Sequence, residues 1–237
     1  MTRQMRILAF LDLLLPRSCL LCGGTAKEAL CVGCSVDLPL PEGAACPRCA
    51  APLAAPAPAC ADCLRHPPAF DATQAALRYT YPVDRLIQQL KFGGRHAFRR
   101  LAAADFLAAR LLAGPHPAGD VIVPVPLSRQ RLAGRGFNQA LEIARPLARA
   151  LHLPLDAASL VRVRETPAQS RLPWRARRAN VRRVFECRAD FSGKGVIVVD
   201  DVMTSGATLD AVARVLKDHG AARVTNWIAA RAARPAT

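Results

Sequence analysis

Aromatic and acidic side chains are both scarce in this sequence. Phe, Trp and Tyr make up only 5% of its 237 residues. Proteins that bind single-stranded nucleic acid usually offer aromatic side chains on which the bases stack, so the scarcity argues against that class. Asp and Glu number 18 against 33 Lys and Arg, which leaves a net charge of +15. This excess favours phosphate-bearing ligands, nucleic acid included, but does not indicate a fold.

The sequence also lacks an apolar run that could span a bilayer and a Walker phosphate loop. The run from Arg3 to Leu15 is short, is interrupted by Asp12 and is followed by no signal-peptide cleavage site, so we expect a docked helix there. No Gly-x-x-x-x-Gly-Lys sequence occurs, which excludes a P-loop nucleotide site. We therefore expect a cytoplasmic protein without a membrane span.

Eight of the nine cysteines form four Cys-x-x-Cys pairs in the first quarter of the chain. Two such pairs supply four thiolates, the complete tetrahedral ligand set of a structural zinc ion, so the repeat predicts a duplicated zinc ribbon. Sequential pairing gives two four-cysteine sites, Cys19, Cys22, Cys31, Cys34 and Cys46, Cys49, Cys60, Cys63. Crossed pairing is the alternative, and disulfides are disfavoured because no export signal is present. Cys187 lies alone in an expected strand, so we expect it in the core.

Stretches rich in Pro and Ala, residues 51–59 and 66–69, indicate a loop and then a linker. We therefore expect an N-terminal helix and double zinc ribbon in residues 1–66 and a second domain in residues 67–237. The expected strands of the second domain are 75–81, 121–125, 160–163, 184–187, 196–199 and 224–228, and the expected helices are 83–91, 97–112, 139–150 and one from 208. Their alternation predicts an α/β fold with a doubly wound parallel sheet.

The stretch from Val196 to Thr208 predicts a binding site. Its apolar strand runs into Asp200 and Asp201, and a small, hydroxyl-rich turn then precedes a helix that should end near Gly220. Backbone N–H groups of such a turn, at the positive end of a helix, can hold a phosphate. The carboxylates can accept hydrogen bonds from ribose hydroxyls or from metal-bound waters. A ligand with an anionic end, a hydroxylated middle and bound Mg²⁺ would suit this stretch.

A second run of strand, loop and helix, residues 121–139, should face the first, because ligands bind beyond the carboxyl ends of parallel strands. Its loop carries Arg129, Arg131 and Arg135 and is followed by Gly136. Guanidinium groups and exposed backbone N–H groups suit a pyrophosphate. The sequence therefore predicts two anion-binding loops at one edge of the sheet.

The stretch from Val196 to Thr208 resembles the ribose-5-phosphate loop of type I phosphoribosyltransferases, in which an apolar strand, two acidic residues and two spacers precede Thr-Ser-Gly-x-Thr. The cysteine pairs, the Pro-Val-Pro…Arg-Gly-Phe-Asn-Gln run, Lys91-Phe-Gly-Gly and Thr166-Pro-Ala-Gln…Arg178-Ala-Asn narrow the resemblance. Over nearly the whole chain, the sequence resembles the ComF/GntX family of phosphoribosyltransferase-like proteins. This resemblance implies binding of 5-phosphoribosyl-1-pyrophosphate (PRPP) with Mg²⁺.

The implied PRPP-binding residues are Asp200, Asp201, Met203, Thr204, Ser205, Gly206, Ala207, Thr208, Arg129, Arg131, Arg135 and Gly136. The implied catalytic residues are Asp200 and Asp201, with Arg175 and Arg178 of the segment 165–183, which corresponds to a mobile loop that closes over the reaction centre in that class. A solvated basic loop is the alternative for this segment.

The implied activity is Mg²⁺-dependent transfer of a phosphoribosyl group to an acceptor that the sequence does not name. ComF-like proteins are associated with DNA uptake during natural competence, so competence proteins are expected partners. The alternative is a non-catalytic accessory protein that senses PRPP or binds single-stranded DNA.

Overall fold

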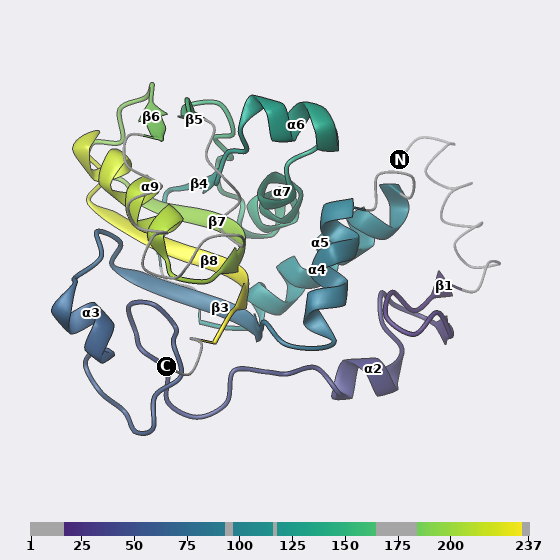
Figure 1. Ribbon diagram of the computed structural model, residues 1–237. Coiled ribbons are helices and arrows are strands. Elements are labelled where there is room, and N and C mark those ends of the chain that lie inside the picture. The colour runs from purple at the N-terminus through teal and green to yellow at the C-terminus, as the bar shows by residue number, and fades with distance from the viewer. Residues whose placement is uncertain (1–16, 93–96, 116–117, 165–183, 234–237) are drawn as a thin grey trace.

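The computed structural model describes residues 17–92, 97–115, 118–164 and 184–233. At its centre lies a four-stranded sheet in the order β3-β8-β7-β4, in which every neighbouring pair is parallel (Figure 1). The strands are β3 (Ala72–Arg78), β4 (Val121–Pro124), β7 (Gly195–Met203) and β8 (Arg223–Arg231). The predicted α/β fold with a parallel sheet is confirmed, although β3 begins three residues earlier than expected.

The central strand β7 is covered on both faces. Its side chains alternate between two cores, with Ile197 and Val199 in one and Val196 and Val198 in the other. The first core contains α4 (Val83–Phe92), α5 (Ala97–Leu112) and α7 (Gln139–Leu151), and the second contains α9 (Ala207–Asp218). The four helices were all expected from the sequence. Each observed start lies within one residue of the expected start, and so does each end of the three helices for which an end was predicted.

Two expected strands do not belong to the parallel sheet. β5 (Leu160–Arg162) and β6 (Phe185–Cys187) pair antiparallel with each other and form a separate two-stranded sheet. Only Leu160 and Phe185 of their side chains are buried, which is typical of a short ribbon with one face against a core. The assignment of these strands to the parallel sheet was therefore wrong. Cys187, expected in the core, is only half-buried.

The predicted arginine loop is a short helix, α6 (Arg129–Arg135). Ser128 caps its start, because the Ser128 Oγ accepts a hydrogen bond of 3.4 Å from the backbone N–H of Arg131. Gly136 ends it in the left-handed conformation, with a φ of 80°. The loop expectation was wrong because these residues combine good helix formers with a cap at each end.

The two cysteine-rich segments contribute to different cores, one on each face of the sheet. The first contains β1 (Arg17–Ser18), β2 (Thr25–Ala26) and α2 (Val32–Val36), and its Cys19 and Leu20 lie in the core of α4 and α5. The second contains α3 (Ala61–Arg65), and its Cys46 and Cys49 lie in the core of α9. The two segments therefore share their cores with the α/β fold, and the domain boundary near Pro67 stays a proposal.

The helix expected in residues 3–15 lies outside the described residues. In the ranges that the structure describes, no helix is both long and apolar enough to cross a bilayer.

Candidate metal centres and phosphate-binding site

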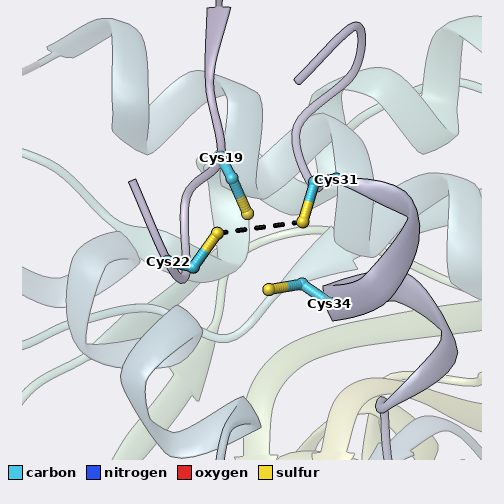
Figure 2. A group of neighbouring side chains, drawn as sticks. All are labelled: Cys19, Cys22, Cys31 and Cys34. Carbon is cyan, nitrogen blue, oxygen red and sulfur yellow. Dashed lines mark hydrogen bonds between the residues drawn. The ribbon is translucent and has the colours of Figure 1, made fainter. Parts of the chain in front are cut away.

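The paired cysteines form two clusters of four, and the grouping is sequential. Figure 2 shows the first cluster, in which the side chains of Cys19, Cys22, Cys31 and Cys34 converge. Cys46, Cys49, Cys60 and Cys63 form the second, and the sulfur atoms of each cluster lie within 4.8 Å of one another. The crossed alternative is thereby excluded.

The spacing of the sulfur atoms fits zinc. The Sγ atoms of Cys22 and Cys31 are 3.8 Å apart, and those of Cys49 and Cys60 are 3.7 Å apart. Four sulfur ligands placed tetrahedrally about 2.3 Å from a zinc ion are about 3.8 Å from one another. A disulfide would bring two sulfur atoms to about 2 Å. Both clusters are therefore closed four-thiolate sites for structural zinc.

Backbone hydrogen bonds favour the thiolate form of one cysteine in each cluster, Cys19 and Cys46. The hydrogen bond with Cys31 raises the pKa of Cys34 to about 12, and burial raises the pKa of Cys49 to about 11. Burial raises the pKa of Cys19, but hydrogen bonds from the backbone of Cys22 and Cys31 outweigh it and bring the pKa to about 6. In the second cluster the backbone N–H of Cys60 donates to the Cys46 Sγ over 3.2 Å. Such donors are typical of metal-binding thiolates and add to the fit of both clusters to zinc.

A separate set of charged residues meets at the carboxyl end of β7. The strand continues through both aspartates to Met203, beyond the end at Val199 that the sequence suggested. Asp201 is buried, and its Oδ2 lies 2.8 Å from the Lys91 Nζ at the end of α4. The Gln139 Nε2, in the first turn of α7, donates to the same oxygen over 3.5 Å. Three elements that are distant in the sequence thus converge on one carboxylate.

The surroundings of Asp200 and Lys91 shift the pKa values of both side chains. Burial, followed by the negative charge of Asp201, raises the pKa of Asp200 to about 8. Burial acts to lower the pKa of Lys91, but the neighbouring Asp201 and Asp200 raise it above its ordinary value. At neutral pH Asp200 is therefore largely protonated, and Lys91 is held as a cation beside the acidic pair.

The stability of the ligand-free protein should decrease as the pH rises toward 8. Asp200 keeps its proton in the folded chain up to a pKa of about 8, whereas its ordinary pKa is 3.8. Between these values the folded state binds more protons than the unfolded state, so each increase in pH favours unfolding. We expect Asp200→Asn to make this pH dependence shallower, measured as the urea midpoint from pH 5 to pH 8. An identical pH dependence in the variant would assign it to another group.

The turn after the acidic pair has the form of an anion site. Gly206 is the N-cap of α9 and has a φ of 78°, which disfavours any other residue. A Cβ at this position would lie only 2.6 Å from the Met203 Cε. Gly206 supplies no side-chain cap, and the nearby Ser205 Oγ accepts from the Ala207 N–H over 3.4 Å. The positive end of α9 thus points its first N–H groups toward the turn, an arrangement that suits a phosphate.

The predicted arginines differ in their relation to the acidic pair. Arg129 is exposed, whereas Arg131 and Arg135 are half-buried. Burial lowers the pKa of Arg135, and the charge of Asp201 opposes this shift, so Arg135 lies within electrostatic reach of the acidic pair. Arg175 and Arg178 lie outside the described residues.

The Phe-Asn-Gln part of the second run builds the site rather than forming a ligand loop. Phe137 is buried, with the Arg100 guanidinium 4.0 Å from its ring centre. The Asn138 side chain caps α7 by accepting from the backbone N–H of Ala140 over 3.0 Å. The buried Gln139 follows this cap, which aims it at Asp201. The sequence contained a cap signal in Asn138, but only the folded structure reveals this role of Gln139.

Sequence reasoning missed Arg231, the last residue of β8. It is buried, and its Nη1 donates to the backbone oxygens of Met203 over 3.0 Å and Thr204 over 2.6 Å. These bonds hold the start of the turn between the acidic pair and α9, the candidate phosphate-binding turn. No sequence signal identified this residue, because an arginine at a strand end has no distinctive pattern.

Comparison with known proteins agrees with this architecture. Residues 138–236 match the family of phosphoribosyl transferase domains, and residues 10–64 match the double zinc ribbon domain. The DNA utilization protein YhgH of Salmonella typhi is 37% identical over 78% of this chain and 83% of its own length. Competence protein F of Haemophilus influenzae is 32% identical over 90% of this chain and 96% of its own length.

A more distant relative is also similar over most of its length. Competence protein ComFC of Bacillus subtilis is 28% identical over 82% of this chain and 80% of its own length. The two family models together cover the second half of the parallel sheet and both cysteine-rich segments. The chain belongs to the ComF family of phosphoribosyltransferase-like proteins.

Proposed function

We propose that this protein binds PRPP with Mg²⁺ at the carboxyl edge of its parallel sheet and transfers the phosphoribosyl group to an acceptor. The observation that carries the proposal is the continuity of the acidic pair with the glycine-capped start of α9. A 5-phosphate held on residues 204–208 would leave the ribose hydroxyls facing Asp200 and Asp201. Along the chain, carboxylates that can accept from ribose hydroxyls are followed directly by backbone N–H groups that can donate to a phosphate. The ribose and the 5-phosphate are adjacent in PRPP in the same way.

The pyrophosphate would lie toward Arg131, Arg135 and Gly136, with Arg129 at the exposed side of α6. Lys91 adds a cation that the arginine pattern did not include. Met203, buried beside Gly206, supports the turn rather than contacting ligand through its side chain. This division gives each charged part of PRPP a counterpart of opposite charge.

The donor set suits Mg²⁺, which prefers oxygen ligands. Asp200 and Asp201 offer carboxylate oxygens, and the Gln139 Oε1 is buried without a hydrogen-bond partner among the described residues. These residues would hold the ion, directly or through waters. When bound, Mg²⁺ would neutralise charge on the pyrophosphate.

In the proposed reaction the bond between the anomeric carbon and the pyrophosphate oxygen breaks, and a nucleophilic atom of the acceptor bonds to that carbon. The released pyrophosphate takes the bonding electron pair. Lys91, Arg131 and Arg135 would stabilise its charge, while the turn and the acidic pair fix the sugar. Positioning and electrostatics would supply most of the rate enhancement, and none of the described residues is required as the nucleophile.

The names of the relatives, a DNA utilization protein and two competence proteins, support a role in DNA uptake or utilization. The same names, with the net charge of +15, also support a non-catalytic accessory protein that senses PRPP or binds single-stranded DNA in association with competence proteins. The aromatic content of 5% is low for a surface on which bases stack. We therefore favour phosphoribosyl chemistry.

Calorimetric titration with PRPP, with and without Mg²⁺, tests the binding site. We expect the parent protein to bind in the presence of Mg²⁺ and Gly206→Ala to weaken binding by about tenfold or more, because backbone strain and the Met203 contact distort the turn. Gly193→Ala is the matched control, since Gly193 has a φ of 74° but open space around its Cβ position. It should bind like the parent.

If the parent protein did not bind PRPP, the proposed function would be wrong. If Gly206→Ala and Gly193→Ala weakened binding equally, the loss would come from backbone strain at any such glycine and not from the turn. A screen for pyrophosphate release over nucleobases and amines then tests catalysis. Release with one acceptor would support transfer, whereas binding without release would favour the sensor.

A further inference from the structure

Arg231 is a buried cation whose hydrogen bonds all go to backbone oxygens. The residue is only 8% exposed, and no carboxylate among the described residues forms a salt bridge with it. Besides its hydrogen bonds to the backbone oxygens of Met203 and Thr204, the Nη1 donates to the backbone oxygen of Ala232 over 2.6 Å. A buried charge without a counter-charge is destabilising, so its retention calls for a nearby anion.

The second cysteine cluster supplies that anion. The Arg231 Nε donates over 2.7 Å to the backbone oxygen of Cys49, one of the four zinc ligands. A zinc ion bound by four thiolates carries a net negative charge, because the thiolate charges exceed that of the ion. Arg231, Cys49, Cys60 and Cys63 also line one cavity of about 420 Å³. The guanidinium thus lies between the second zinc site and the phosphate-binding turn.

Two further contacts join the segment that directly follows the second ribbon to the turn and to α9. The backbone N–H of Ala69 donates over 2.7 Å to the Oδ1 of Asp210, in the first turn of α9. The Phe70 ring is 3.8 Å from the Cβ position of Gly206. Ser205 and Gly206 line the same cavity as the cysteines. The turn is therefore built against the second ribbon and not only on the end of β7.

The first ribbon has a comparable arginine but no contact of this kind. The Arg99 Nη2 donates over 3.1 Å to the backbone oxygen of Leu20, beside Cys19. Its Nε donates over 3.1 Å to the Oε1 of Gln89 on α4. These bonds join the first ribbon to α4 and α5, on the opposite face of the sheet from α9. Arg99 is therefore a matched comparison for Arg231.

We propose that Arg231 is a positioning residue that couples the second zinc site to the phosphate-binding turn. In this arrangement the net negative charge of the second four-thiolate zinc site would compensate the guanidinium, and the guanidinium fixes the carbonyl groups of Met203 and Thr204. The following backbone N–H groups are thereby set for a phosphate. Ligand affinity then depends on the second zinc site and not on the first. The identity of the ligand as PRPP rests on the proposed function, but the coupling itself does not.

Arg231→Met and Arg99→Met separate the two arginines. Hydrogen exchange of residues 203–208 should accelerate about tenfold or more in Arg231→Met and stay at the parent rate in Arg99→Met, because only Arg231 bonds to the turn. PRPP affinity should fall about tenfold or more in Arg231→Met alone. Arg231→Lys keeps the charge but loses the forked donation, so it should give intermediate exchange.

Cys60→Ala and Cys31→Ala test the zinc sites without changing either arginine. Each should retain one zinc ion by metal analysis, but only Cys60→Ala should accelerate exchange at the turn. Parent-like exchange in folded Arg231→Met, or equal acceleration in the two cysteine variants, would overturn the coupling. If Arg231→Met does not fold, Arg231→Lys and the cysteine pair still decide the question. A parent protein that fails to bind PRPP would reject the proposed function while the exchange rates still report on the coupling.

Discussion

Removing zinc should unfold the cysteine-rich segments of this protein. Each four-cysteine site is closed and structural, and binding at such a site contributes on the order of 10 kcal/mol to folding. We expect metal analysis to find two zinc ions per chain, one for each cluster. A strong chelator should then produce a large loss of structure by circular dichroism and a large decrease in the thermal midpoint.

The loss should spread beyond the ribbons. Cys19 and Leu20 are buried in the core of α4 and α5, and Cys46 and Cys49 in the core of α9. Unfolding either ribbon would expose apolar surface on one face of the sheet. The thermal transition of the metal-free protein should therefore be broad or absent, rather than that of an intact α/β domain with an unfolded appendage.

Cysteine variants provide the control for this prediction. Cys187→Ala changes a half-buried cysteine outside both clusters and should keep two zinc ions and the parent midpoint. Cys31→Ala should lose one ion and destabilise the first ribbon, yet leave PRPP binding measurable because this ribbon does not contact the turn. One ion in the parent would contradict the two-site assignment, and iron in its place would contradict the choice of metal.

The parts of the fold that local sequence patterns encode could be predicted. Residues 97–112 form the expected helix because their apolar side chains recur with helical spacing and several of them are buried on one face. The strand from Val196 was equally predictable, since its continuous apolar run is typical of a strand covered on both faces. The zinc clusters followed from the Cys-x-x-Cys spacing, because a tight turn places two thiolates together.

Long-range contacts could not be predicted in the same way. Asp201 was predicted to be a site residue, but its partners Lys91 and Gln139 come from two helices distant in the sequence. The bond from Arg231 to Cys49 joins residues 182 positions apart. Helix α6 was missed because its arginines and glycines suggested a loop, although its two caps favour a short helix. The contacts that could not be predicted depend on tertiary packing, whereas helix α6 was missed because local sequence features favoured both a loop and a helix.

Replacing both aspartates, Asp200→Asn and Asp201→Asn together, should weaken Mg²⁺-dependent PRPP binding about tenfold or more. Asparagine retains the side-chain size but removes the negative charge that attracts the ion and half of the acceptor oxygens. The fold should persist, because Lys91, which loses its partner, has a side chain 24% exposed and can reach water. Calorimetry with and without Mg²⁺ measures the loss, and circular dichroism monitors the fold.

Asp105→Asn supplies the matched control for the charge change. Its carboxylate is 64% exposed and pairs over 3.9 Å with Arg149, a contact between α5 and α7 that contributes little to stability. This variant should bind PRPP like the parent. If the folded double variant also bound with parent affinity and kept its dependence on Mg²⁺, the acidic pair would not contact the ligand. In that case the ion must be held by other residues, since the backbone N–H groups of the turn do not bind metal. The turn after β7 would then resemble a phosphoribosyl site only in its architecture.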